Sequence, residues 1–342
     1  MSKEYSALLD RLLTGDDLTE RQAYELMHKL ADGELPAALA GALLAGLRAK
    51  GETADEIRGF ATAMRELAVH PNIPDGAPTV DTVGTGGDGS GSLNLSTGTG
   101  LLAAACGSRV VKHGNRSVSS RSGSADMLEC LGMPLPLHEQ QAVACLEATG
   151  FTFLFAPAYH PAMKAVVPIR GALSVRTVFN VLGPLTNPSA PPFQLIGAYS
   201  QEAAKLMADT LFGMPLERAF VVHGEPGWDE ATPVGEFCLY DVTPGKVTES
   251  QRCPEDYGLQ RCAPQQLKGG EAEHNAKELV RVFTGEDKGA HRDALLMGTS
   301  LVLEVQGEAK NAKDGVAQAA AAIDDGRAES FLDNLRQHFS DQ

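Results

Sequence analysis

The first stretch of this sequence that could do chemistry is a glycine-rich loop. The residues GTGGDGSG (84–91) follow a β-type run, TVDTV (79–83), and precede NLST (94–97), which opens a helix rich in small residues. Glycines let a backbone approach an anion closely, and helix N-terminal amides with Ser and Thr hydroxyls donate hydrogen bonds to phosphate oxygens. The pattern therefore favours a polyphosphate site. The alternative is a Gly-rich turn capped by Asn94 or Ser96.

The same loop matches G-x-G-x-x-G over 84–89, the pattern of dinucleotide-binding folds. Such a fold needs an acidic residue about 20 residues further on, at the end of the second strand, to hold a ribose hydroxyl. The end of that strand carries Lys112 and His113 instead, and Asp88 in the loop would repel a bare pyrophosphate. A dinucleotide is therefore disfavoured. The sequence has no G-x-x-x-x-G-K-[ST], so a P-loop kinase is not supported either.

A basic loop follows the second β-type run. The segment KHGNRSVSSRSGS (112–124) contains Lys112, Arg116 and Arg121 among several serines. In a parallel sheet this loop would emerge beside the glycine loop, so that both line one crevice. Cations with hydroxyls and amides suit a dense polyanion such as a phosphorylated sugar diphosphate. The alternative is a solvated surface loop in which Ser122 or Ser124 caps a following helix.

The N-terminal part of the chain predicts a small helical domain over residues 1–70. Two S/T-x-x-E/Q capping boxes, at 19–22 and 53–56, mark helix starts, and Pro36 stands where a first helical residue would. The three prolines of PNIPDGAP (71–78) then predict a linker.

Beyond residue 79, short β-type runs alternate with helical stretches, which is typical of a mostly parallel sheet with helices on both faces. Ligands bind at the strand carboxyl ends of such sheets. We therefore predict an α/β fold: a small N-terminal helical domain plus a larger α/β domain over 79–342 with a mostly parallel central sheet. The segment 271–339 reads as helices, and helices near 160–185 are expected to join the first domain, with the site in the cleft between the two. The β-type runs are 79–83, 109–112, 151–155, 193–199 and 218–223.

Composition limits the possible functions. The chain has 342 residues, 43% of them apolar and 21% charged, as in ordinary globular proteins. Its net charge of −15 disfavours nucleic acid and anionic membranes as partners, so phosphate binding has to be local. We expect a cytoplasmic protein, because the N-terminus lacks a signal-peptide pattern and no apolar run reaches about 18 residues. The six cysteines form no C-x-x-C pair and are expected to be free thiols.

Taken together, the motifs resemble those of the anthranilate phosphoribosyltransferase family, over nearly the whole chain. The resemblance implies transfer of the phosphoribosyl group of 5-phosphoribosyl 1-diphosphate (PRPP) to the amine of anthranilate. The products would be N-(5-phosphoribosyl)anthranilate and diphosphate, in the second step of tryptophan biosynthesis from chorismate. The matching segments are GTGGD (84–88), NLST (94–97), KHGNRSVSSRSGSAD (112–126), FAPAYHPAM (155–163), PIRGALSVRTVFNVLGPLTNP (168–188) and Asp229-Glu230.

The resemblance also implies which residues bind each ligand. Two Mg²⁺ ions per subunit would be held by Ser96, Asp229 and Glu230, whose hard oxygen atoms suit that ion. Anthranilate would contact Gly84, Asn115, His160 and Arg170, with the guanidinium paired to the carboxylate. Family members pair through the helical domain, which implies a homodimer. PRPP would be held by Gly84, Gly87, Asp88, Ser92, Asn94, Leu95, Ser96, Thr97, Lys112, His113, Gly114, Asn115, Arg116, Ser117, Val118, Ser119, Ser120 and Ser124.

For the reaction that the resemblance implies, we predict no covalent intermediate. The aromatic amine is neutral at pH 7 and is already a nucleophile, so the barrier lies in diphosphate departure and an oxocarbenium-like transition state. Lys112, Asp229 and Glu230 are therefore the candidate catalytic residues, acting electrostatically. His113 and His160 either transfer a proton or only donate to phosphate and line the aromatic site.

Several positions differ from the usual family pattern: NLST replaces the commoner NIST, Gly98 and Gly100 stand where alanines are usual, and two further positions lie beside candidate ligands. Trp228 stands beside the candidate metal pair, where an aliphatic residue is more typical, which suggests an effect on loop motion or substrate entry. Gly171 follows Arg170 where the family often has a polar or basic side chain.

Two other functions compete with the transferase. A pyrimidine nucleoside phosphorylase-like enzyme shares the fold but should not need a metal pair, so Asp229 and Glu230 weigh against it. A non-catalytic nucleic-acid-binding relative would be expected to have lost GTGGD and KHGNR and to carry a basic face, whereas this chain keeps both motifs and a charge of −15.

Overall fold

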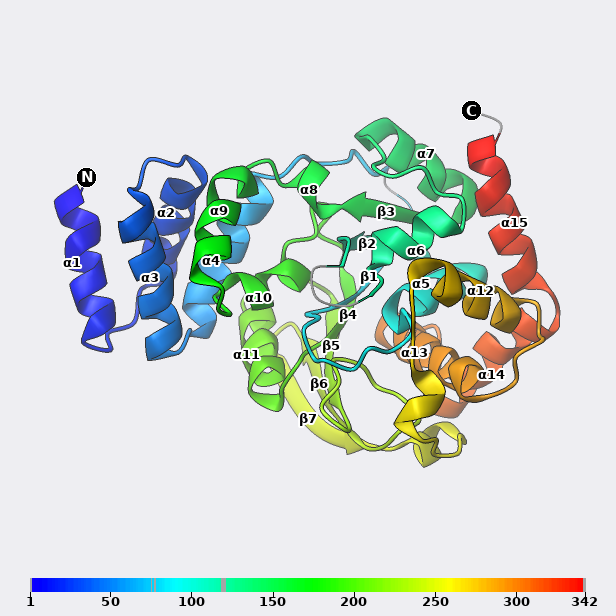
Figure 1. Cartoon of the computed structure of the whole chain (residues 1–342). Helices are drawn as coiled ribbons and strands as arrows, with labels where there is room; N and C mark the ends of the chain where they lie inside the picture. The colour runs from blue at the N-terminus through cyan, green and yellow to red at the C-terminus, as the bar shows by residue number, and fades with distance from the viewer. Residues whose placement is uncertain (1, 75, 77, 118–120, 341–342) are drawn as a thin grey trace.

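The computed structural model describes residues 2–74, 76, 78–117 and 121–340. Its N-terminal part is a helical bundle, at the left of Figure 1. Both capping boxes are confirmed: the Gln22 amide donates to Thr19 Oγ1 at 3.2 Å, and the Glu56 amide to Thr53 Oγ1 at 3.3 Å. Pro36 is the N-cap and not the first helical residue, so that prediction was wrong by one position. The bundle helices are α1 (Ser2–Leu13), α2 (Glu20–Ala31), α3 (Ala37–Lys50) and α4 (Ala54–Glu66).

The predicted mostly parallel sheet is confirmed. Within the described residues it has seven strands in the order β3-β2-β1-β4-β5-β6-β7, with β1 to β5 parallel. The last two strands are antiparallel and were not predicted. The strands are β1 (Thr79–Gly84), β2 (Arg109–Gly114), β3 (Phe151–Phe155), β4 (Phe193–Gly197), β5 (Arg218–Gly224), β6 (Phe237–Thr243) and β7 (Lys246–Arg252).

Helices cover both faces of the sheet, as predicted. Because strand side chains alternate between faces, Phe220 and Val222 of β5 join the core under α5 and α13, whereas Val221 joins the core under α11. The remaining elements are α5 (Leu95–Ala105), α6 (Ser124–Cys130), α7 (Glu139–Thr149), α8 (Ala156–Tyr159), α9 (Met163–Leu173), α10 (Phe179–Leu182), η1 (Gly183–Leu185), α11 (Gln201–Phe212), η2 (Pro254–Tyr257), η3 (Pro264–Leu267), α12 (Ala272–Phe283), α13 (Ala290–Gln306), α14 (Ala312–Asp324) and α15 (Arg327–Ser340).

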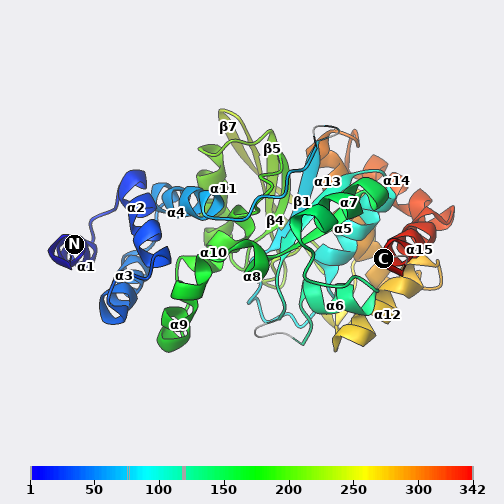
Figure 2. The same ribbon diagram turned by 90° about the horizontal axis from the view of Figure 1, so that it is seen from above.

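The helical bundle and one face of the sheet share a continuous hydrophobic core. Phe60 of α4 and Phe179 of α10 meet edge to face with ring centres 6.3 Å apart, and Ile196 of β4 belongs to the same cluster. Helix α9 packs against α2 and α3, although it is far from them in sequence (Figure 2). The segment between β3 and β4 therefore reaches back to the bundle, and the carboxyl ends of β1 and β2 open between the two parts. No helix among the described residues is long and apolar enough to span a membrane.

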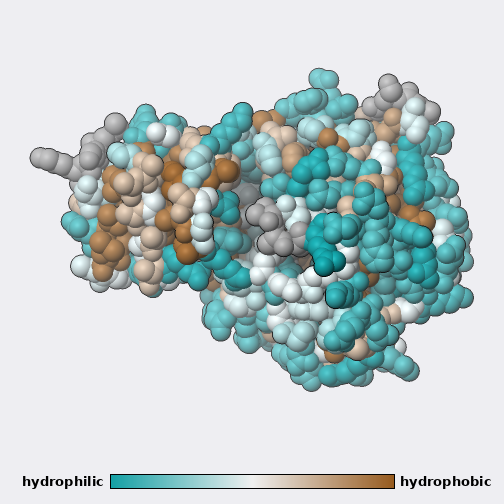
Figure 3. Space-filling model, in the orientation of Figure 1, coloured by the Kyte–Doolittle hydropathy of each residue, from teal (hydrophilic) through white to brown (hydrophobic). Residues whose placement is uncertain are grey.

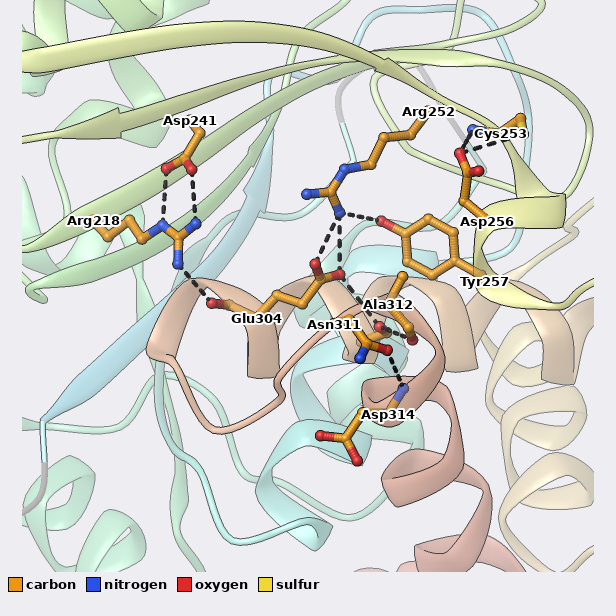
Figure 4. A network of polar contacts seen from close by, with 11 residues as sticks. Arg218, Asp241, Arg252, Cys253, Asp256, Tyr257, Glu304, Asn311, Ala312 and Asp314 are labelled. Atoms are coloured by element: carbon orange, nitrogen blue, oxygen red, sulfur yellow. Dashed lines mark hydrogen bonds and ion pairs between the residues drawn. The ribbon is translucent and has the colours of Figure 1, made fainter.

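Two arginines fasten the antiparallel end of the sheet to α13 (Figure 4). Arg218 donates to both carboxylate oxygens of Asp241, at 2.8 and 2.7 Å, and to the Glu304 carbonyl at 3.0 Å. Arg252 donates to the Glu304 carboxylate at 3.0 Å and to the Tyr257 hydroxyl at 2.8 Å. The polar edge strand β7 is thus held by charge-assisted hydrogen bonds.

Replacing Glu304 with Ala is expected to lower the free energy of unfolding by about 2 kcal/mol. The Glu304 side chain is only 11% exposed, and its loss leaves the 24% exposed Arg252 side chain without its carboxylate partner. Urea denaturation measures the change. Glu278→Ala is the control, because it removes one of two carboxylate partners of Arg281, which is 43% exposed, and surface pairs contribute less than about 1 kcal/mol. Equal losses in both variants would contradict the expected role of Glu304.

Candidate active site

One cavity opens at the carboxyl ends of β1 and β2, between the helical bundle and the α/β part, where the surface in Figure 3 is hollowed. The glycine loop and the basic loop both line it, together with α9 and α10. The two loops therefore share one crevice, as the sequence predicted. The predicted site residues that line it are Gly84, Gly87, Asp88, Ser92, Asn94, Ser96, Lys112, His113, Gly114, Asn115, Arg116, Ser117, Ser124, His160, Arg170, Asp229 and Glu230.

Among the described residues, two predicted PRPP ligands do not line this cavity. Leu95 is 3% exposed in the hydrophobic core and Thr97 is fully buried, so neither side chain reaches the cavity and any contact would come from backbone groups. Helix α5 begins at Leu95, and its first turn points these two side chains inward. Three more predicted ligands, Val118, Ser119 and Ser120, lie outside the described residues.

Arg116 lines the cavity, but acidic neighbours engage its guanidinium. It donates to Asp126 at 2.9 Å and to Glu129 at 2.5 and 2.6 Å, both on α6. These pairs raise its pKa above the ordinary range. Three further cations line the cavity and were not predicted as ligands: Arg121, Lys164 and Lys268. The backbone of Lys268 pairs with that of Ser92 in an isolated antiparallel β-bridge beside the glycine loop. The available sequence signal was its position before the Gly269-Gly270 pair.

The Asp229-Glu230 pair is not a solvated turn. It runs past the ends of two strands so closely that a Cβ at Gly197 would lie 1.6 Å from the Asp229 carbonyl oxygen, and one at Gly224 would lie 2.2 Å from that of Glu230. Asp229 is only 8% exposed. The neighbouring Trp228 is buried in the hydrophobic core and does not line the cavity, so the structure does not support the suggested effect on substrate entry.

Backbone amides of both predicted phosphate-binding elements donate to this acidic pair. The Gly86 amide in the glycine loop donates to Asp229 at 2.6 Å, and the Ser96 amide at the start of α5 donates to Glu230 at 3.1 Å. Asp88 accepts from the Asp229 amide at 3.3 Å. Asp88, Asp229 and Glu230 therefore lie close together beside the N-terminal end of α5.

Burial and mutual repulsion disfavour the ionised forms of the carboxyl groups in this cluster. Burial and the nearby Asp88 raise the pKa of Asp229, and burial and Asp229 raise the pKa of Glu230 well above its ordinary value. Lys112 is the compensating cation: it is 1% exposed, its ammonium donates to the Thr82 carbonyl, and it lies 3.4 Å from Ser96 Oγ. Burial lowers the pKa of Lys112, against the attraction of Asp81 and the acidic pair. An excess of buried negative charge is what a divalent cation would neutralise.

The donor set suits Mg²⁺ bound together with a substrate. Among the described residues, no three His, Cys, Asp or Glu side chains form a complete metal cage. Mg²⁺ is typically held by one or two carboxylates plus substrate phosphates and water. Asp229, Glu230 and the Ser96 hydroxyl fit that pattern, because they lie between the two phosphate-type loops.

The anthranilate side of the cavity combines apolar walls with one cation. Arg170 projects from α9 with its guanidinium carbon 5.2 Å from the Phe179 ring centre, and burial lowers its pKa. Met163 and Val167 also line this side. No carboxylate among the described residues pairs with Arg170, so the cation is available to an aromatic acid. A Cβ at Gly171 would have no atom within 4 Å, so the adjacent position is open.

His113 and His160 are buried side by side, with ring centres 5.0 Å apart. Burial lowers the pKa of His113 to about 3 and that of His160 to about 4. Both rings are therefore neutral at pH 7.

Acidification is expected to destabilise the protein through this histidine pair. The unfolded chain takes up protons near pH 6.5, whereas the folded rings resist protonation until about pH 4, so stability is lost as pH falls through that window. Urea denaturation at several pH values should show a shallower loss in His160→Asn than in the wild type. His138→Gln, at an exposed position, is the control and should follow the wild type. A slope unchanged by His160→Asn would contradict the burial argument.

Comparison with known proteins places the chain in a family. The family model described as "Glycosyl transferase family, a/b domain" matches residues 76–329, and the one described as its helical bundle domain matches 6–68. Anthranilate phosphoribosyltransferase from Rubrobacter xylanophilus is 42% identical over 96% of this chain and 95% of its own length. The chain belongs to the anthranilate phosphoribosyltransferase family.

Other anthranilate phosphoribosyltransferases are similarly close to this chain in sequence and structure. The protein from Brevibacillus brevis is 44% identical, with 96% of each chain covered. The crystal structure of the Thermus thermophilus protein has a TM-score of 0.91 and 42% identity, covering 97% of this chain and 99% of that one. The structure from Saccharomyces cerevisiae in complex with PRPP and Mg has a TM-score of 0.90 and 25% identity, covering 100% and 99%. These relatives favour the transferase over both alternatives.

Proposed function

We propose that this chain transfers the phosphoribosyl group of PRPP to the amine of anthranilate, releasing diphosphate, as the second step of tryptophan biosynthesis from chorismate. The supporting observation is the single cavity in which two phosphate-type loops, the buried acidic pair and an arginine among apolar walls come together. Family membership supplies the identity of the two substrates.

The two ends of the cavity have different tasks. We assign PRPP to the glycine loop and the basic loop, where backbone amides and hydroxyls suit phosphate oxygens. Lys112 lies near the end of β2 with its ammonium 3.4 Å from Ser96 Oγ, and it would balance charge developing on the departing diphosphate. Arg170 would hold the anthranilate carboxylate, and the Phe179 ring beside it is an apolar surface for the aromatic ring.

Asp229, Glu230 and Ser96 would hold Mg²⁺, with two ions per subunit. When bound, Mg²⁺ supplies positive charge that stabilises the leaving diphosphate. The residues fit this role because the two carboxylates are buried with raised pKa values and have too little cationic compensation from Lys112.

The residues do not need to supply a base or a nucleophile. The neutral anthranilate amine forms a bond to the ribose C1 as the bond from C1 to the diphosphate oxygen breaks, and the proton that the nitrogen then loses passes to the departing diphosphate or to water. His113 and His160, both with lowered pKa values, would shape the wall of the aromatic site as neutral rings. The chain's task is to orient two substrates, exclude water and stabilise charge.

We extend the proposal to the organisation of the protein. Residues 1–70 together with α9 would form the helical domain, and 79–342 the PRPP-binding domain. We propose a homodimer through the helical domain on the basis of family membership. A cytoplasmic location is consistent with free thiols at all six cysteines.

The test is the loss of anthranilate fluorescence when purified protein is mixed with PRPP. We expect a loss that requires Mg²⁺ and stops with excess chelator. A folded protein that binds PRPP but leaves anthranilate fluorescence unchanged with Mg²⁺ would contradict the proposed acceptor. Turnover that persists in excess chelator would contradict the metal site.

A further inference from the structure

Arg176 reaches the glycine loop from outside the cavity. It lies in the segment 174–178 between α9 and α10 and is not one of the residues that line the cavity. Its Nη2 donates a hydrogen bond to the Gly87 carbonyl oxygen at 2.6 Å. Its guanidinium carbon lies 4.0 Å from the centre of the Tyr199 ring, within the range of cation–π contacts. Arg176 therefore touches the loop and not the space for a ligand.

This contact fixes a flexible part of the loop. Gly87 has φ +71°, in the left-handed region that glycine enters without strain, and Gly86 and Gly89 have φ +66° and +73°. A run of such glycines has little conformational preference of its own. In a trans peptide the carbonyl and the following amide point in opposite directions, so holding the Gly87 carbonyl turns the Asp88 amide away from Arg176.

The end of β4 supports the same loop. The Thr85 amide donates to the Gly197 carbonyl at 2.9 Å, and the Tyr199 amide donates to Thr85 Oγ1 at 3.0 Å. Tyr199 thus fastens the start of the loop with its backbone and supports Arg176 with its ring. We call Thr85, Gly87, Arg176 and Tyr199 the loop brace.

The loop brace connects the two substrate sides. Arg176 follows α9, which carries Arg170 and packs against α2 and α3 of the bundle. We propose that Arg176 is a positioning residue that couples the anthranilate side to the PRPP loop, so that a carboxylate bound at Arg170 favours the PRPP-binding arrangement of residues 84–88. This inference rests on the proposed function. Because binding free energies are linked, PRPP must favour the aromatic acid by the same factor.

Arg176→Met tests the proposal, because it keeps the aliphatic stem and removes both the charge and the hydrogen bond. We expect KM for PRPP to rise about tenfold, the size of one lost charge-assisted hydrogen bond. KM for anthranilate at saturating PRPP should rise by the coupling factor that Arg176→Met loses, because the linkage is reciprocal. Arg176→Lys keeps the charge and should recover part of the loss. Arg21→Met is the matched control, since Arg21 also lies over a tyrosine ring, that of Tyr24, but in the helical bundle.

Binding measurements separate coupling from a structural role. Calorimetric titration of PRPP with Mg²⁺, with and without benzoate as an unreactive carboxylate, gives the coupling factor. The wild type should bind PRPP more tightly with benzoate, and Arg176→Met should lose most of that gain. Amide hydrogen exchange over residues 84–92 should be faster in Arg176→Met, with the melting temperature close to that of the wild type.

The outcomes distinguish this inference from the function on which it rests. A wild type with no anthranilate turnover would overturn the proposed function. An active wild type in which Arg176→Met keeps the coupling factor and the KM for PRPP would overturn only the role of Arg176. Increases in both KM values with the benzoate coupling factor unchanged would also overturn it, because they would indicate a general structural defect.

Discussion

Replacing Asp229 with Asn and Glu230 with Gln in one chain is expected to abolish Mg²⁺-dependent turnover while the fold stays intact. The two carboxylates are the proposed metal ligands, and neutral amides bind Mg²⁺ far more weakly. Turnover should fall by at least about a thousandfold, since the charge that stabilises the leaving diphosphate is lost. Steady-state rates across a range of Mg²⁺ concentrations measure the effect.

Stability distinguishes a lost metal site from a damaged fold. Burial raises the pKa of both carboxyl groups, which means that ionising them costs stability in the metal-free protein. The double variant, measured in chelator, should therefore unfold at the same temperature as the wild type or higher. Glu236→Gln is the control, an exposed acid in the same hairpin region, and it should keep normal turnover. Unchanged Mg²⁺ dependence in the double variant would refute the placement of the metal.

Local sequence signals predicted the elements that carry the site. The capping boxes at Thr19 and Thr53 need only residues three positions apart, and both form as expected. The parallel strands were visible as short apolar runs between helices. The strand β7, with the polar sequence KVTESQR and a mostly exposed surface, has no apolar run and escaped prediction. It pairs with β6, and its Arg252 also bonds Glu304 on α13, a long-range partner that no local pattern reveals.

Long-range contacts also explain what the sequence could not predict about the site. Taken alone, Asp229-Glu230 is a typical solvated turn, and it is buried because Gly197 and Gly224 at two strand ends leave room for its backbone. Arg176 has no local signal at all, because its partner Gly87 lies 89 residues away. A glycine at the end of a predicted strand is therefore the sequence feature that indicates where another backbone segment can pass close by.

The chain can bind phosphate despite its overall negative charge because a few cations and backbone amides are concentrated in the cavity. Lys112 is buried near the end of β2, while Arg116 is engaged by Asp126 and Glu129 on the loop's own helix. The cavity therefore offers backbone amides and a few cations, and not a broad basic surface. This arrangement suits a small polyanion that carries its own divalent cation and disfavours nucleic acid.

Arg170→Ala is expected to raise KM for anthranilate by about 10- to 150-fold, which corresponds to the loss of about 1.5–3 kcal/mol of charge-assisted hydrogen bonding. KM for PRPP should change little, because Arg170 lies on α9, on the aromatic side of the cavity. The expectation follows from the geometry: a half-buried guanidinium over the Phe179 ring, with no carboxylate partner among the described residues. Steady-state kinetics with each substrate varied in turn measure both constants.

Lys164→Ala tests whether the anthranilate carboxylate pairs specifically with Arg170 or is attracted by any positive charge in the cavity. Lys164 lies on the same helix and also lines the cavity, so its removal costs the same unit of charge. If Arg170 binds the carboxylate through its planar guanidinium, Arg170→Lys should recover only part of the lost affinity and Lys164→Ala should have a much smaller effect than Arg170→Ala. Equal increases in both Michaelis constants for Arg170→Ala, or equal effects of the two alanine variants on anthranilate, would mean that the aromatic acid is held by another part of the cavity.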